Sequence, residues 1–269
     1  MFISYQSSLY IFIFLVGLCF GSFMNVMIYR LPRNLSLLKP SSYCPSCNNQ
    51  LIFPDLIPTF SYLFLRGRCR CCGEKIGLRY LLVELLTASL FLLVFCNFNL
   101  SIDFVFYMIL LFLLLSCSLI DLEHRIVPNR IITAGLIAGL FFYLIQLAAV
   151  NLSIPSWLIV ERGFIDALTG MFLGSTVMLA IYHFSRGGMG AGDVKLMAII
   201  GFFVGLQGTA VILLLGFIFG AIFGLTFWAL GRLTMKNALP FAPFLSMATL
   251  VEVLWGAQIW DWYTSLFQF

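Results

Sequence analysis

The chain has 269 residues, of which 62% are hydrophobic and 10% are charged, and its net charge is +4. A soluble globular domain is nearer half apolar and a quarter charged, so this composition excludes an ordinary soluble protein. The small net charge does not indicate a nucleic-acid partner. Because the apolar runs are long and do not alternate with polar residues, the sequence predicts an all-α polytopic membrane protein in contact with the lipid bilayer.

Eight apolar runs are candidates for membrane spans. They cover residues 9–29, 81–97, 102–121, 129–150, 164–185, 193–207, 208–231 and 240–260, which predicts about eight transmembrane helices. The run 193–207 is short for a bilayer core of ~30 Å, which needs about 20 residues, and Gly205 and Gly208 leave its end open. The first run has no small-residue cleavage site followed by a soluble chain, so we interpret it as an anchor and not as a removed signal peptide.

The positions of lysine and arginine predict the orientation. With the N-terminus outside, every basic residue except Arg162 lies on the cytoplasmic side, as the positive-inside rule requires. The cytoplasmic residues are Arg30, Arg33, Lys39, Arg66, Arg68, Arg70, Lys75, Arg79, Arg125, Arg130, Arg186, Lys195, Arg232 and Lys236. This orientation also places Asp121 and Asp193 together at the cytoplasmic face, although neither residue was used to set it.

Two aspartates stand at the ends of apolar runs. Asp121 closes the run 102–121, and Asp193 opens the run 193–207 after a glycine-rich stretch. A carboxylate beside a bilayer-length apolar segment is costly, which indicates a functional site. Two such acids at one membrane depth can share a proton and divide the roles of general acid and general base. The alternative is that Asp193 only caps the next helix.

The glycine-rich stretch before Asp193 runs from Gly187 and Gly188 to Gly190 and Gly192. Glycine permits positive φ and a close approach to another chain, which an extended peptide substrate requires. Gly190 and Gly192, with Lys195, therefore form a candidate substrate loop.

The helix dipole suggests how the two acids differ. Asp121 is expected near a helix C-terminus, where the dipole disfavours negative charge, and Asp193 near a helix N-terminus, where the dipole favours it. We therefore predict that Asp121 rests protonated and Asp193 rests ionised, so that Asp193 activates the attacking water. The argument fails if Asp121 lies inside a longer helix.

The one sizeable polar segment of the sequence, residues 33–79, contains the cysteine pairs Cys44-Pro45-Ser46-Cys47 and Cys69-Arg70-Cys71-Cys72. Two such pairs are typical of a tetrahedral zinc site, and the metal would replace the core that so small a loop cannot build. The predicted ligands are Cys44, Cys47, Cys69 and Cys72, with Cys71 as the alternative to Cys72. Disulfides or idle thiols are the other interpretation, which the reducing cytoplasm disfavours.

Several stretches resemble one known family. Gly190-Ala191-Gly192-Asp193 looks like the GxGD motif of intramembrane aspartyl proteases. Asp121, followed by Val127 and Pro128, is similar to the other aspartate motif of the type IV prepilin peptidases. The stretch 17–32 resembles that family's opening signature, in which Gly17 and Gly21 are expected to allow close helix packing. The stretch 240–244 resembles the family's P-F-G-P-F sequence, with Ala242 in place of the usual glycine.

The resemblance implies a membrane-embedded aspartyl endopeptidase of the bacterial cytoplasmic (inner) membrane, with Asp121 and Asp193 as its catalytic residues. Its substrates would be type IV prepilin or pseudopilin precursors of pilus or type II secretion systems, cleaved at the end of a short basic leader on the cytoplasmic side. Family members with a four-cysteine loop are commonly also N-methyltransferases that use S-adenosyl-L-methionine. The sequence does not identify the residues that would bind this methyl donor.

The expected domains are a first transmembrane helix at 1–32, a zinc-binding loop at 33–79 and a protease core at 80–269. Two other functions stay open at this point. One is methyl transfer alone, and the other is a non-enzymatic assembly factor whose zinc loop docks partners. The second of these predicts that both aspartates are replaceable.

Overall fold

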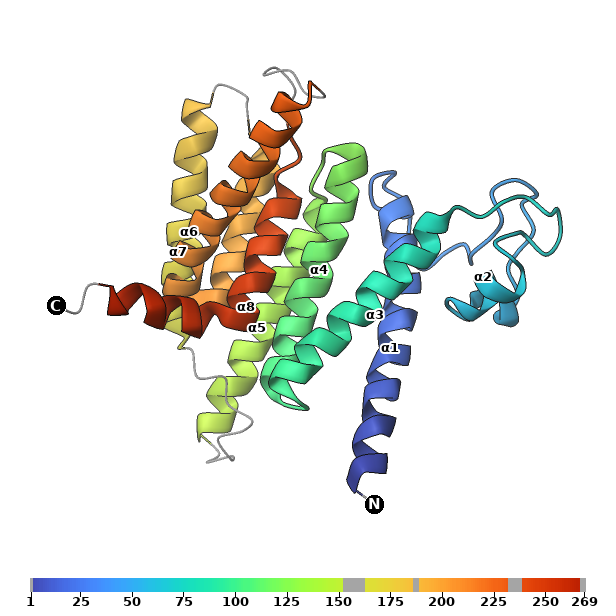
Figure 1. Ribbon diagram of the computed structural model, residues 1–269, viewed down its shortest axis with the longest axis horizontal. Helices are drawn as coiled ribbons and strands as arrows, with labels where there is room; N and C mark the ends of the chain where they lie inside the picture. Colours follow the sequence, from blue (N-terminus) through green and yellow to red (C-terminus); the bar gives the residue numbers. More distant parts are fainter. Residues whose placement is uncertain (1, 152–162, 186–188, 232–238, 267–269) are drawn as a thin grey trace. The chain divides into compact units, whose positions relative to one another are not determined.

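The computed structural model describes residues 2–151, 163–185, 189–231 and 239–266 of the chain. It is helical and forms two compact units, residues 1–99 and 100–269 (Figure 1). Seven of its helices are long and apolar enough to cross a membrane. Large apolar side chains such as Ile11, Phe141 and Leu214 point outward with about 60% of their surface exposed, which suits contact with lipid. The chain is therefore a multi-pass membrane protein, as predicted.

The first unit is built on two long helices, α1 (Phe2–Arg30) and α3 (Leu78–Phe98). They approach closely because Gly17 and Gly21 carry no side chain. A Cβ added at Gly17 would lie 2.6 Å from the Cα of Ala88, and one added at Gly21 would lie 2.5 Å from the Cα of Glu84. The expected close packing at these glycines is confirmed. The loop between the helices contains the cysteine pairs and the short helices η1 (Phe53–Leu56) and α2 (Phe60–Phe64).

The second unit contains α4 (Ile102–His124), α5 (Asn129–Asn151), α6 (Phe164–Phe184), α7 (Ala191–Ala229) and α8 (Ala242–Ser265). Helix α7 packs against α6 and α8, and α8 also packs against α4. Stacked rings of Phe106 and Phe203, whose centroids are 4.5 Å apart, join α4 to α7 in the core. The loops that contain Arg162, Arg186, Arg232, Lys236, Gly187 and Gly188 lie outside the described residues.

Helix α7 is not straight. Its 39 residues would measure about 58 Å as one helix, nearly twice a bilayer core. Gly205 interrupts it with φ 72° and ψ −172°, a conformation that is open essentially to glycine alone. A Cβ added at Gly174 of α6 would lie 2.9 Å from Met197 and 3.2 Å from Thr209, yet these two residues would be about 18 Å apart on a straight helix. The chain therefore folds back at Gly205.

This reversal reconciles the eight predicted runs with seven long helices. The runs 193–207 and 208–231 are the two arms of α7, and the boundary between them lies at Gly205. Asp166, in the first turn of α6, stabilises the reversal, because its Oδ1 accepts the N–H of Leu206 at 3.0 Å. This carboxylate therefore caps the start of the second arm.

We expect Gly205→Ala to destabilise the second unit strongly. A methyl group at residue 205 would meet the Asp166 carboxylate, and the positive φ disfavours any side chain. Gly231→Ala is the matched control, because Gly231 also has positive φ (68°) but no atom of the described residues lies within 4 Å of a Cβ added there. The midpoint of thermal unfolding in detergent should fall by several degrees more for Gly205→Ala than for Gly231→Ala. Equal losses would mean that Asp166 does not pack on the reversal as described.

Candidate active site and metal centre

Asp121 lies in the last turn of α4 and is 6% exposed. The helix ends there because Arg125 adopts the left-handed conformation (φ 55°, ψ 40°) and donates its N–H to the Asp121 carbonyl at 2.9 Å. The Arg125 guanidinium is close enough for its charge to act on the Asp121 carboxylate. The predicted position of Asp121 at a helix C-terminus therefore agrees with the structure.

The sequence did not reveal that Asp121 also faces a helix N-terminus. The backbone N–H of Ala242, the first residue of α8, donates to Asp121 Oδ2 at 3.2 Å. A hydroxyl pair one turn deeper fixes this contact: Ser118 and Ser246 lie 2.6 Å apart, and Ser246 also bonds the Ala242 carbonyl at 2.8 Å. The stretch around Ala242 thus presents a backbone donor to the first acid.

Asp193 is the third residue of α7 and is 7% exposed. The helix begins after Gly190, and Asp193 N–H donates to the Gly190 carbonyl at 3.1 Å. A Cβ added at Gly190 would lie 3.6 Å from Asp193 Oδ2, so the carboxylate lies beside the glycine backbone. The two carboxylates are close enough for the charge of Asp121 to act on Asp193. The structure therefore brings the two predicted acids together.

The loop after α4 packs against the start of α7. A Cβ added at Gly192 would lie 2.9 Å from the Val127 side chain, which explains why glycine is needed here. Lys195 Nζ donates to Asn129 Oδ1 at 2.9 Å, at the start of α5. Of the three residues of the predicted substrate loop, Gly190 and Lys195 are exposed and Gly192 is half-buried; Gly192 contacts Val127, and Lys195 is bonded to Asn129 of α5.

The prediction that Asp193 alone is the base loses its physical ground. The prediction assumed that Asp193 lies at a helix N-terminus, whose dipole favours negative charge, and that Asp121 lies only at a helix C-terminus, whose dipole disfavours it. The N-terminus of α8 now faces Asp121, and its N–H bond and dipole oppose the effect of the α4 C-terminus. The dipole argument therefore no longer separates the two acids, because each carboxylate lies at the N-terminus of one helix.

The cysteine pairs fold as two matching knuckles. In the first, Cys44 N–H donates to the Asn49 carbonyl at 2.9 Å and Asn48 N–H donates to the Cys44 carbonyl at 2.8 Å. In the second, Cys69 N–H donates to the Glu74 carbonyl at 2.8 Å and Gly73 N–H donates to the Cys69 carbonyl at 3.0 Å. Asn48 and Gly73 both have positive φ. In this register Cys72 matches Cys47, and Cys71 matches Ser46.

The thiols of Cys44, Cys47, Cys69 and Cys72 form one cluster in which all sulfur atoms lie within 4.8 Å of one another. The Cys44 and Cys72 sulfurs are 3.9 Å apart, close to the ~3.8 Å that a tetrahedral site with Zn–S bonds of ~2.3 Å requires. Cys71 is not in the cluster, and its sulfur accepts Asn49 Nδ2 at 3.0 Å. The four predicted ligands thus fit a tetrahedral metal ion.

The protonation of the cluster also favours a cation. The backbone N–H groups of Cys47 and Ser46 face the Cys44 sulfur and lower its pKa to about 6. Cys47 faces the Asn49 N–H, which lowers its pKa, but burial and the neighbouring thiols outweigh this and raise the pKa to about 12. Sulfurs packed this closely cannot all be anionic unless a positive ion lies between them.

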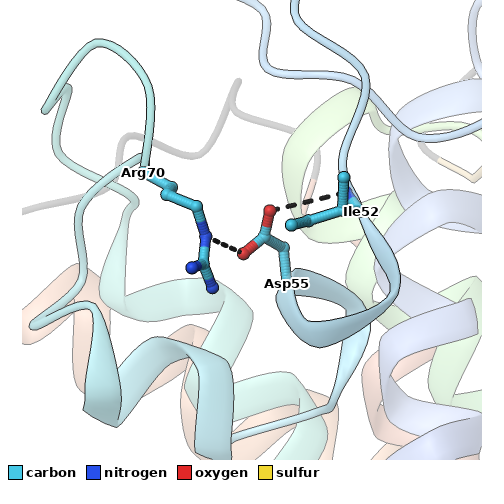
Figure 2. Close-up of polar contacts among 3 residues, drawn as sticks. All are labelled: Ile52, Asp55 and Arg70. Atoms are coloured by element: carbon cyan, nitrogen blue, oxygen red, sulfur yellow. Dashed lines mark hydrogen bonds and ion pairs between the residues drawn. The ribbon is translucent and has the colours of Figure 1, made fainter.

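A cavity of 520 Å³ lies within the first unit, between the ends of α1 and α3 and the cysteine-containing loop. Its lining includes Asn25 from α1 and Glu84 from α3, which are 5% and 8% exposed. At its rim, Asp55 joins two parts of the loop, because it accepts Arg70 Nε at 2.8 Å and the Ile52 N–H at 3.4 Å (Figure 2). The sequence alone does not relate Asn25 to Glu84, because the cavity depends on the fold of the loop between their helices.

Two family models match the chain, and they divide it much as its fold does. The bacterial peptidase A24 N-terminal domain matches residues 15–98, and the type IV leader peptidase family matches residues 108–225. No solved structure gives a significant match.

The relatives cover nearly the whole chain. A prepilin leader peptidase/N-methyltransferase of Bacillus subtilis is 35% identical over 256 residues, which are 94% of this chain and 97% of that protein. Proteins of the same name from Aeromonas salmonicida and Legionella pneumophila are 32% and 30% identical, with at least 93% of each chain covered. The chain belongs to the type IV leader peptidase family, peptidase A24.

Proposed function

We propose that the protein is a prepilin leader peptidase and N-methyltransferase of the bacterial cytoplasmic membrane, and that Asp121 and Asp193 are the catalytic pair of the peptidase. The pairing of the two buried carboxylates carries this proposal. The names of relatives that match over almost the whole chain support the two activities. The substrates are type IV prepilin or pseudopilin precursors, whose leaders are cut at the cytoplasmic face where α4 ends and α7 begins.

Peptide hydrolysis needs one base and one acid at this site. One carboxylate takes a proton from a water molecule, whose oxygen then attacks the peptide carbonyl carbon. The other carboxyl group gives its proton to the leaving amine as the C–N bond breaks. The Ala242 N–H holds Asp121 in place for this reaction, and the exposed Gly190 offers backbone to the extended substrate.

The four clustered cysteines would hold one zinc ion with a structural role. Zinc with four thiolate ligands has no open coordination position for a substrate. The ion would join the two knuckles and so fix the loop that covers the cavity of the first unit. The three-part division into residues 1–32, 33–79 and 80–269 remains a proposal beside the two compact units.

Incubation of the purified protein with a prepilin tests the proposal. We expect a shorter pilin that has lost its basic leader and, when the methyl donor is added, an N-terminal residue heavier by one methyl group. Cleavage without any methylation would support only the peptidase activity. Methylation of a pre-cleaved pilin without cleavage of the precursor would favour a methyltransferase, and neither reaction would favour an assembly factor.

A further inference from the structure

We propose that the cavity of the first unit is the binding site of the methyl donor, S-adenosyl-L-methionine. This inference rests on the proposed methyltransferase function but not on the peptidase mechanism. The acid pair belongs to the unit of residues 100–269, within which the peptidase model matches residues 108–225, whereas the cavity belongs wholly to residues 1–99. A second activity of relatives that span the full chain therefore needs a second site, and the first unit has one of suitable size.

The volume and lining of the cavity fit this ligand. Small-molecule sites usually measure about 300–1,000 Å³, are mostly apolar and contain a few convergent polar groups. The cavity measures 520 Å³ and is lined by apolar side chains such as Val26, Leu56 and Leu81. Four tyrosines, Tyr29, Tyr43, Tyr62 and Tyr80, also line it. Aromatic faces suit both the adenine ring and a sulfonium cation.

The charges of the lining select a ligand that carries both signs. Three basic and three acidic residues contribute to it, namely Arg30, Arg70, Lys75, Asp55, Glu74 and Glu84, and the pairing of Asp55 with Arg70 leaves two of each sign. A nucleoside polyphosphate or an anionic lipid would favour a basic lining. The methyl donor carries an ammonium group, a carboxylate and a sulfonium, so a balanced lining matches it better.

Two buried polar groups of the lining offer specific contacts. The Asn25 amide donates to the Tyr80 carbonyl at 3.1 Å, but its Oδ1 is buried and has no hydrogen-bond partner in the described part of the chain. A buried acceptor of this kind costs stability unless a ligand donates to it. Glu84 accepts the Thr59 N–H and hydroxyl through Oε2. We assign Asn25 to the adenine amino group and Glu84 to the ribose hydroxyls.

The cavity is also placed where the methyl acceptor would be. Ser22, Asn25 and Glu84 lie on the membrane-spanning helices α1 and α3, at the end of each helix that adjoins the cysteine-containing loop. The acceptor is the N-terminal amine of a pilin helix that emerges from the membrane. In the transfer, the neutral amine nitrogen bonds the methyl carbon, the C–S electron pair stays on sulfur as a thioether, and the new ammonium loses one proton to water.

Binding of S-adenosylhomocysteine, the thioether product, tests the site without turnover. Isothermal titration of the full-length protein in detergent should show saturable binding. Val26→Trp fills the cavity and should abolish binding, whereas Phe23→Trp places the same indole ring on the exposed side of α1 and should leave binding unchanged. Asn25→Leu should weaken binding about tenfold through the lost hydrogen bond.

Cleavage of a prepilin by each variant separates this inference from the peptidase proposal. Retained cleavage shows that a variant is folded, and if Val26→Trp fails this control, Asn25→Leu decides. A wild-type protein that cleaves but does not bind S-adenosylhomocysteine would overturn the inference and leave the peptidase standing. Full binding of S-adenosylhomocysteine by Val26→Trp and Asn25→Leu proteins that still cleave a prepilin would also overturn it. Binding without cleavage would instead support the cavity and count against the acid pair.

Discussion

Asp121→Asn and Asp193→Asn should each abolish leader cleavage, with a loss of at least about 10³- to 10⁴-fold in rate. Each carboxyl group supplies one half of the proton transfer, and residues that act as a unit lose nearly the whole effect when one is removed. Asparagine keeps the size and can still accept the Ala242 N–H, so the fold should be preserved. Gel or mass analysis of prepilin incubated with each purified variant measures the loss.

Glu123→Gln is the matched control for these variants. Glu123 is an exposed acid in the same last turn of α4 as Asp121, so its neutralisation changes the charge of that turn without touching the buried pair. Its cleavage rate should remain near that of the unchanged protein. Normal leader removal by a folded Asp193→Asn protein would contradict the aspartyl mechanism.

Replacement of a clustered cysteine should remove the metal and unfold the loop locally. We expect one zinc ion per chain in the purified protein and almost none in Cys44→Ser or Cys72→Ser, because three thiolates hold a tetrahedral ion poorly. The helical signal of the second unit should persist. Elemental analysis of each purified variant provides the measurement.

Cys71→Ser is the control for the cysteine variants. The Cys71 sulfur accepts a hydrogen bond from the Asn49 side chain and lies outside the cluster, so its loss should leave the zinc content unchanged. Zinc that is retained in Cys72→Ser and lost in Cys71→Ser would show that the two knuckles pair in the other register.

The register of the cysteines could have been predicted from the sequence. Asn48 follows Cys47, Gly73 follows Cys72, and both have positive φ, which asparagine and glycine tolerate best. A residue of this kind directly after the second cysteine of each pair identifies Cys72 as the partner of Cys69. Residue spacing alone left Cys71 as an alternative because it ignored this turn chemistry.

The helices were predictable because a membrane protein must bury its backbone polar groups in long apolar helices. The short run 193–207 was the exception, and its end required the fold. A reversal at Gly205 depends on the positive φ of that glycine and on Asp166, which is 39 residues earlier in the chain. Neither the length of the apolar runs nor the local residue pattern relates Gly205 to Asp166.

The environment of the acids was less predictable than their identity. Asp121 and Asp193 stand out because carboxylates are costly beside apolar runs. The donor to Asp121 is a backbone N–H of Ala242, 121 residues later, and backbone groups leave no signal in the side-chain pattern. The apolar run 240–260 predicted a helix, but not which carboxylate its start would face. The cavity around Asn25 likewise depends on contacts between distant segments.

We propose that two separate sites act in sequence, the acid pair on the precursor and the cavity of the first unit on its product. In the test, Val26→Trp protein first cleaves a prepilin, and the cleaved pilin is then incubated with Asp193→Asn protein and the methyl donor. Mass spectrometry records the mass of the pilin N-terminus. We expect Asp193→Asn protein to leave the precursor uncut but to add one methyl group to the cleaved pilin. A cleaved pilin that stays unmethylated, although Asp193→Asn binds S-adenosylhomocysteine normally, would contradict it.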